Sequence, residues 1–150
     1  KKGVEEVIMN FDDFKFNVGN IVMFCQIIEH DIKVIYASML KGDYNKNYQE
    51  LIDSNMTLGQ TINNLQELDF SDSNHFFAKS DYIYLKQISR KRNYWCHQAY
   101  LNFVYIENFE YSKEYKDECL KLQNDCDKLN DVFMQVQKIK KDALKKYGRI

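Results

Sequence analysis

The run Arg92–His97 brings together three side chains that can act on a phosphate ester: Arg92, Asn93 and His97. Histidine exchanges protons near neutral pH and serves as a general acid or base. The planar guanidinium of arginine suits a phosphate better than lysine does and stabilises charge that develops on it. This combination predicts metal-free chemistry at a phosphodiester, in which His97 moves protons, Arg92 holds the phosphate and Asn93 orients either group. No metal or other cofactor is needed for that chemistry.

Further basic and aromatic side chains flank these three residues. Arg90 and Lys91 extend the positive charge along the backbone of a bound nucleic acid. Tyr94 and Tyr100 are candidates to stack on bases, and so is Trp95, although a large aromatic residue more often belongs to the core. An ordinary alternative covers the whole stretch, because runs of charge are usually solvated helix faces and a lone histidine is often structural.

The spacing within the run limits the sites that it can form. Five residues turn about 500° around a helix, which leaves Arg92 and His97 about 140° apart. In a straight helix the two side chains therefore do not share a face. They converge only where the backbone kinks at Asn93, where the long arginine stem reaches around the helix, or where a second chain completes the site.

The run Arg92–His97 resembles the signature of HEPN domains, in which an arginine is followed after four to six residues by a histidine, often with an asparagine directly after the arginine. The order of the expected helices is also similar, and residues 28–37 resemble the long first helix of such domains. The resemblance implies a metal-independent endoribonuclease that cleaves RNA by 2′-hydroxyl attack. It also implies a homodimer whose two motifs face one cleft, and a toxin–antitoxin or phage-defence context with a cognate antitoxin protein.

Two further features of HEPN families can be compared with this chain. Many HEPN toxins carry a tyrosine two residues after the histidine, and a nucleotidyltransferase antitoxin modifies it. Here Ala99 occupies that position and the nearest tyrosine is Tyr100, so the chain lacks the tyrosine that such an antitoxin usually modifies to neutralise the toxin. Some families also carry an acidic residue and a lysine four apart on the first helix. Glu29 and Lys33 fit that spacing, and an ordinary i,i+4 salt bridge explains them equally well.

The charge of the whole chain does not favour nucleic acid. The net charge is −1 and the isoelectric point about 6.3, so any contact with RNA must come from a local patch. A second such patch is the C-terminal basic tail, for which compensation of the helix dipole is the ordinary explanation. The tail consists of Lys138, Lys140, Lys141, Lys145, Lys146 and Arg149.

The other two histidines, His30 and His75, lack a second ligand at metal spacing.

The four cysteines, Cys25, Cys96, Cys119 and Cys126, form no CxxC pair and fit no zinc pattern. We expect reduced, buried thiols and a cytoplasmic protein. No stretch is long and apolar enough to span a membrane, and no signal peptide is visible. The chain starts at Lys1 rather than at a methionine, so it can be part of a longer protein.

Hydrophobic periodicity and the absence of proline predict helices along most of the chain. Gly42 ends the first helix, Thr57 and Gln60 form a capping box, and Ser80 or Asp81 caps the helix that follows the polar loop. The helices are expected over about 11–40, 44–53, 57–68, 80–90, 94–106 and 112–147, with a loop over 70–79 and a kink near Arg92–Asn93.

The last helix carries an apolar residue at every seventh position: Tyr115, Leu122, Leu129, Val136 and Ala143. This seam packs either inside the domain or on a partner helix. We expect one all-α domain over residues 1–150, an up-and-down antiparallel bundle of four to five helices. Two functions compete with the ribonuclease: a non-catalytic module that binds nucleotide, RNA or protein, and a helical scaffold that oligomerises through the seam.

Overall fold

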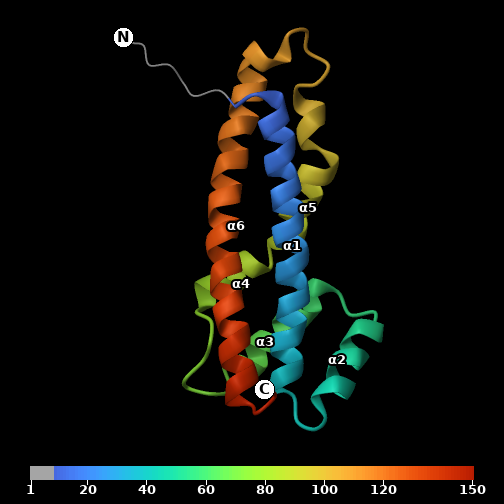
Figure 1. Ribbon diagram of the computed structural model, residues 1–150, viewed down its shortest axis with the longest axis vertical. Helices are drawn as coiled ribbons and strands as arrows, with labels where there is room; N and C mark the ends of the chain where they lie inside the picture. The colour runs from blue at the N-terminus through green and yellow to red at the C-terminus, as the bar shows by residue number, and fades with distance from the viewer. Residues whose placement is uncertain (1–8) are drawn as a thin grey trace.

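The computed structural model describes residues 9–150, and this part of the chain is all-α, as the sequence predicts (Figure 1). The helices pack around one continuous hydrophobic core, which confirms a helical bundle. They are α1 (Phe11–Met39), α2 (Tyr44–Asp53), α3 (Leu58–Asp69), α4 (Lys79–Leu85), α5 (Ile88–His97) and α6 (Lys113–Lys146), with short 3₁₀ turns at Ala99–Asn102 and Phe109–Tyr111.

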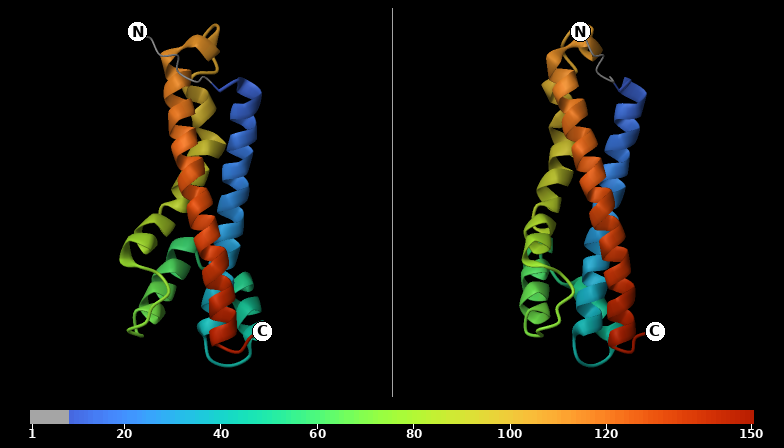
Figure 2. Two further views of the ribbon diagram at one scale, coloured as in Figure 1. Left: turned by 60° about the vertical axis from the view of Figure 1, so that its left-hand side comes forward. Right: turned by 90° about the vertical axis from the view of Figure 1, so that its left-hand side faces the viewer.

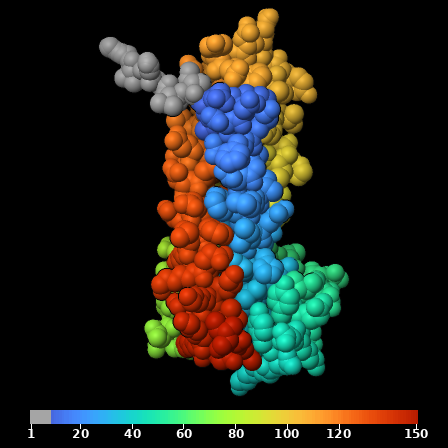
Figure 3. All heavy atoms as spheres, in the orientation of Figure 1, coloured from blue at the N-terminus to red at the C-terminus, as the bar shows by residue number. Residues whose placement is uncertain are grey.

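Helices α1 and α6 form the longest pair and lie side by side along the molecule (Figures 1 and 3). They run parallel, because α4 and α5 carry the chain back in the opposite direction between them, while α3 and α4 lie to one side of the pair (Figure 2).

The seam of α6 is fully buried: Tyr115, Leu122, Leu129, Val136 and Ala143 are each 0% exposed. Burial of each Leu or Val side chain stabilises the fold by about 1.5–3 kcal/mol. The seam therefore packs inside the chain, the first of the two alternatives.

The helix that carries the motif is straight where a kink was expected. α5 runs without interruption from Ile88 to His97, so the predicted kink at Arg92–Asn93 is wrong. The break lies earlier, at Lys86 and Gln87, where the backbone N–H of Gln87 donates to the carbonyl of Tyr84, three residues back. No proline or glycine marks this point in the sequence. Both neighbours of the break, Leu85 and Ile88, are buried in the core.

The helix expected over residues 94–106 stops at His97, so that prediction is also wrong beyond this residue. Its presumed apolar stripe is on the surface, since Leu101 is 61% and Tyr105 85% exposed. The chain instead turns so that Ala99 and Phe103 enter the core. Phe103 then packs edge-to-face on Phe14 at a centroid distance of 5.2 Å. An aromatic cluster at this end of the bundle thus outweighs the local helical pattern.

Two caps show how the helices around the loop begin. Thr57 and Gln60 form the predicted capping box at the start of α3. The predicted cap at Ser80 or Asp81 is wrong, because the next helix starts two or three residues earlier: Ala78 is the N-cap, and the Asp81 carboxylate accepts its backbone N–H at 2.8 Å. A carboxylate in the first turn also interacts favourably with the helix dipole.

The cysteines are all free. Cys25 and Cys119 are buried and Cys126 is half-buried, as expected of structural thiols, whereas Cys96 is exposed, which corrects the expectation at that position. Among residues 9–150, no helix is both long and apolar enough to cross a membrane.

Candidate functional site

The straight helix α5 separates the two principal motif residues. The Arg92 side chain faces α1 and forms an ion pair with Glu29, both being partly buried at 29% and 22% exposure. His97 is the exposed last residue of α5, and its side chain makes no hydrogen bond or ion pair with residues 9–150. Arg92 and His97 therefore do not meet within one chain, as the rotation of about 140° between them requires.

A different set of side chains shares the face of His97. Arg90, Asn93 and His97 are all exposed. Seven residues turn about 700° around a helix, so Arg90 and His97 lie only about 20° apart in direction, and Asn93 about 40° from His97. None of the three side chains has a hydrogen bond or ion pair to the part of the chain that the structure describes. We call these three residues the α5 stripe.

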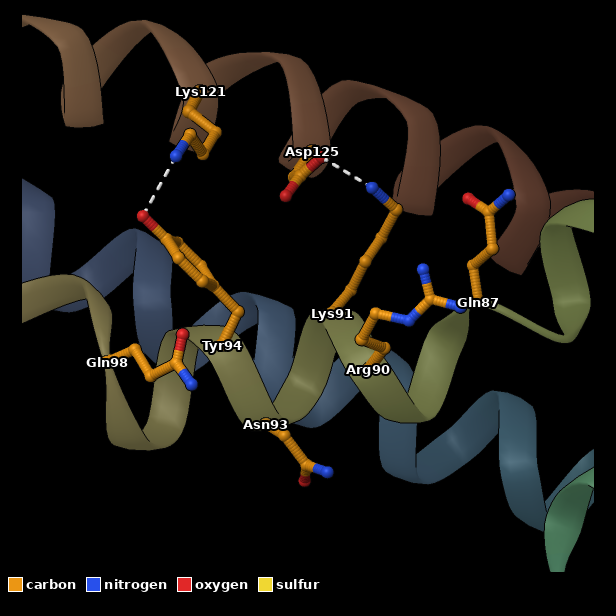
Figure 4. A pocket seen from close by; sticks show the side chains of 8 residues that line it. All are labelled: Gln87, Arg90, Lys91, Asn93, Tyr94, Gln98, Lys121 and Asp125. Atoms are coloured by element: carbon orange, nitrogen blue, oxygen red, sulfur yellow. Dashed lines mark hydrogen bonds and ion pairs between the residues drawn. The ribbon is translucent and has the colours of Figure 1, made fainter.

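A pocket of about 580 Å³ lies beside this stripe, between α5 and α6. Figure 4 shows Lys91, Tyr94 and Lys121 pointing into the space between the two helices, with Asn93 at the outer edge and pointing away from α6. Arg90 and Asn93 belong to both the stripe and the pocket. The lining residues are Gln87, Arg90, Lys91, Asn93, Tyr94, Gln98, Lys121 and Asp125.

Asp125 of α6 anchors the middle of α5. Its carboxylate accepts a hydrogen bond from the indole N–H of Trp95 at 2.8 Å and pairs with the Lys91 ammonium at 3.1 Å. Trp95 is 0% exposed, so it belongs to the core and not to a stacking surface. A buried indole N–H needs such a partner. The bond fixes which face of α5 points outward, and so positions the stripe.

The Tyr94 hydroxyl is the centre of a second network. It donates to the carboxylate of Glu118 at 2.6 Å, and Lys121 and Asn102 donate to it at 2.9 and 3.1 Å. Burial, and then the bond to Glu118, raises the pKa of Tyr94. The bond to Tyr94 raises the pKa of Lys121, because it favours the charged form. At neutral pH the pocket wall therefore holds a neutral phenol and an ammonium ion.

Two other candidate residues, Tyr100 and Glu29, have structural partners. Tyr100 packs edge-to-face on Phe11 and Phe14 in the aromatic cluster, outside the pocket, so base stacking is not its role in this geometry. Glu29 is paired with Arg92, and no ion pair joins it to Lys33, so the i,i+4 salt bridge considered for these two residues is wrong. The pair Glu29–Arg92 ties α5 to α1 instead.

The two remaining histidines are held by hydrogen bonds. His75 Nδ1 bonds the Phe77 carbonyl at 2.8 Å in the loop before α4. His30 lies between Asp31, at 3.0 Å from Nδ1, and the Tyr48 hydroxyl, at 3.0 Å from Nε2. Within residues 9–150, no group of three or more His, Cys, Asp or Glu side chains is arranged as metal ligands would be.

Three cations of the basic tail, Lys140, Lys146 and Arg149, bond other parts of the bundle. Lys140 pairs with Asp31, and Lys146 pairs with Asp72 at 3.2 Å. Arg149 donates to the carbonyl oxygens of Leu40 and Gly42, and to that of Ser38 near the C-terminal end of α1. Cations at such carbonyls compensate a helix dipole. These contacts fit the ordinary explanation of the tail, compensation of a helix dipole, and the helix whose dipole is compensated is α1.

Several residues of the site carry no signal that a single sequence reveals. Asp125, Glu118 and Lys121 lie on α6, about thirty residues from the motif, and look like solvated charges in a long amphipathic helix. Glu118 and Asp125 fall on the same side of α6 because seven residues make nearly two turns. That spacing is compatible with a shared function, and equally with chance.

Comparison of the chain with protein-family models, with curated proteins and with solved structures gives no match.

Proposed function

We propose that this protein is a metal-independent endoribonuclease of the HEPN kind, which cleaves RNA by attack of a 2′-hydroxyl on the adjacent phosphate. The observation that supports this proposal is the α5 stripe: a histidine, an asparagine and an arginine without internal partners line one exposed helix face. Unpartnered polar groups of these types suit a phosphodiester, and a stripe on a helix that is locked by Trp95 and Asp125 is held in place for it.

His97 acts as the general base that takes the proton of the 2′-hydroxyl. The 2′-oxygen then bonds to phosphorus, and the bond from phosphorus to the 5′-oxygen breaks. An imidazolium from a second copy of the chain protonates the leaving 5′-oxygen. The products are a 2′,3′-cyclic phosphate and a 5′-hydroxyl end.

Arg90 and Asn93 hold the phosphate in this proposal. Arg90 takes the role that the sequence motif suggests for Arg92, because the charge of Arg92 is already balanced by Glu29. A guanidinium without an internal carboxylate offers all its donors to the phosphate oxygens. Arg92 instead positions α5 against α1. Two copies whose stripes face one cleft form the proposed homodimer, and a cognate antitoxin in a toxin–antitoxin or phage-defence system is part of the same proposal.

The test is cleavage of a mixed RNA in excess EDTA, with analysis of the new ends. The proposal predicts cleavage that survives the chelator and leaves 2′,3′-cyclic phosphates, and an approximately thousandfold loss in His97→Ala. RNA binding that weakens with salt but is never followed by turnover would instead indicate the non-catalytic module. The α6 seam, on which the scaffold alternative depends, is buried inside the chain where α6 packs against α1, so it offers no surface for oligomerisation.

A further inference from the structure

We infer that the pocket between α5 and α6 binds one nucleotide of single-stranded RNA, adjacent to the phosphate that the α5 stripe would hold. The inference rests on the proposed function for its choice of RNA. It assigns a ligand to a pocket of about 580 Å³, which is within the usual range of 300–1,000 Å³ for small-ligand sites. The size suits one nucleotide rather than a duplex groove.

The pocket lies directly beside the α5 stripe and shares two residues with it. Arg90 and Asn93 line the pocket and are also members of the stripe. One turn of α5, about 6 Å, separates Asn93 from His97. A strand whose phosphate lies at the stripe therefore places a neighbouring nucleotide at the pocket, without bending away from α5.

The chemistry of the lining supplies the second step. Arg90 on α5 provides a cation without an internal partner for the phosphate, whereas Lys91 pairs with Asp125 at 3.1 Å and Lys121 with Glu118 at 3.4 Å. Gln87 and Gln98 add side-chain amides that bond nothing in the part of the chain described by the structure. An amide presents a donor and an acceptor side by side, which matches the edge of an unpaired base. A cation without an internal partner, together with free amides, favours a nucleotide over a simple anion.

The rigidity of the pocket wall supplies the third step. Lys121 is held by the Tyr94 hydroxyl at 2.9 Å and lies over the Tyr94 ring, 4.5 Å from its centroid. Glu118, which accepts from Tyr94, is only 5% exposed. Lys91 is held by Asp125 at 3.1 Å. Side chains that are already ordered lose less entropy when a ligand binds, so the wall is prepared for one.

The test uses the wild-type chain and calorimetric titration with the four ribonucleoside 5′-monophosphates, ribose 5-phosphate and inorganic phosphate. None of these probes contains a phosphodiester, so the measurement does not depend on cleavage. We expect at least one nucleotide to bind about tenfold more tightly than ribose 5-phosphate, because the base edge contributes. Equal affinities for all probes, or no binding by any, would overturn the inference while leaving the ribonuclease proposal to its own test.

Gln98→Ala locates the binding in the pocket, with Gln123→Ala as its matched control on an exposed part of α6 outside the pocket. Gln98 bonds the Tyr94 carbonyl through its backbone N–H, which the substitution keeps. We expect Gln98→Ala to lower the affinity of the preferred nucleotide severalfold and Gln123→Ala to leave it unchanged. Equal behaviour of the two variants would place the nucleotide elsewhere.

A short RNA with methylated 2′-hydroxyls, which cannot be cleaved by this mechanism, distinguishes a strand from a free nucleotide. We expect it to displace the preferred nucleotide competitively. A nucleotide that remains bound in the presence of saturating RNA would show a pocket for a free effector and would contradict the inferred RNA subsite.

Discussion

The histidines of α1 and α5, His30 and His97, are both exposed, but their side chains differ in hydrogen bonding. His30 has both ring nitrogens engaged, by Asp31 and by the Tyr48 hydroxyl. His97 has no such partner within residues 9–150, and it lies beside two further polar side chains that also have none, Arg90 and Asn93.

A polar group that stabilises the fold thus differs from one that is free for a ligand in the internal hydrogen bonds that it makes. The cluster around His30 is closed: Asp31 is 2% exposed and also accepts from Gln137 and Lys140, so it joins α1 to α6. The α5 stripe is open, because its exposed side chains make no hydrogen bond or ion pair within residues 9–150. We therefore expect substitutions in the closed cluster to change stability, and substitutions in the stripe to change activity.

The largest expected effect on stability is that of Asp31→Ala. This substitution leaves Lys140, Gln137 and His30 without their common acceptor, so the free energy of unfolding should fall by about 3 kcal/mol. Urea denaturation followed by circular dichroism measures it. Asp127→Ala, an exposed acidic residue of α6, is the control and should stay within about 0.5 kcal/mol of wild type. A similar small change in Asp31→Ala would show that the cluster does not stabilise the bundle.

The second prediction compares the two arginines of α5. Arg90→Ala should lower kcat/KM for RNA cleavage about a hundredfold, close to 2.7 kcal/mol, with little change in stability. Arg92→Ala should lower kcat/KM less than tenfold and the free energy of unfolding by about 1 kcal/mol, because its pair with Glu29 is partly exposed. A larger loss of kcat/KM in Arg92→Ala than in Arg90→Ala would show that Arg92 binds the phosphate, as the sequence motif suggests.

These two arginines also show what the sequence could and could not reveal. The α6 seam and the Thr57–Gln60 cap were predictable, because each depends on residues close together in one helix. The outward face of α5 was not, because the bond from Trp95 to Asp125 and the pair of Arg92 with Glu29 join residues thirty and sixty-three positions apart. The end of α5 at His97 was missed for the same reason: Phe103 is drawn into the aromatic cluster with Phe14.

A third prediction applies the comparison of closed and open environments to the thiols. Burial raises the pKa of Cys25 to about 12, so very little thiolate forms at pH 8, and the side chain is inaccessible in the folded state. Cys96 is exposed, next to His97. Iodoacetamide should therefore modify Cys96 at least about a hundredfold faster than Cys25, as mass spectrometry of timed digests measures. Equal rates would mean that α5 opens away from α1 in solution.

The smallest expected effect separates the two histidines by stability alone. His30→Ala removes hydrogen bonds to Asp31 and Tyr48 and should lower the free energy of unfolding by about 1 kcal/mol. His97→Ala removes no internal bond and should change it by less than about 0.5 kcal/mol. Thermal denaturation of the two variants under identical conditions compares them. A larger loss in His97→Ala than in His30→Ala would reverse the comparison.

The most direct test of the account is RNA cleavage by wild type, His97→Ala and His30→Ala, side by side in EDTA at a temperature where all three are folded. We expect His97→Ala to lose about a thousandfold in rate and His30→Ala to stay within about threefold of wild type. Cleavage retained by His97→Ala, or lost equally in both variants, would contradict the assignment of chemistry to the open stripe of α5.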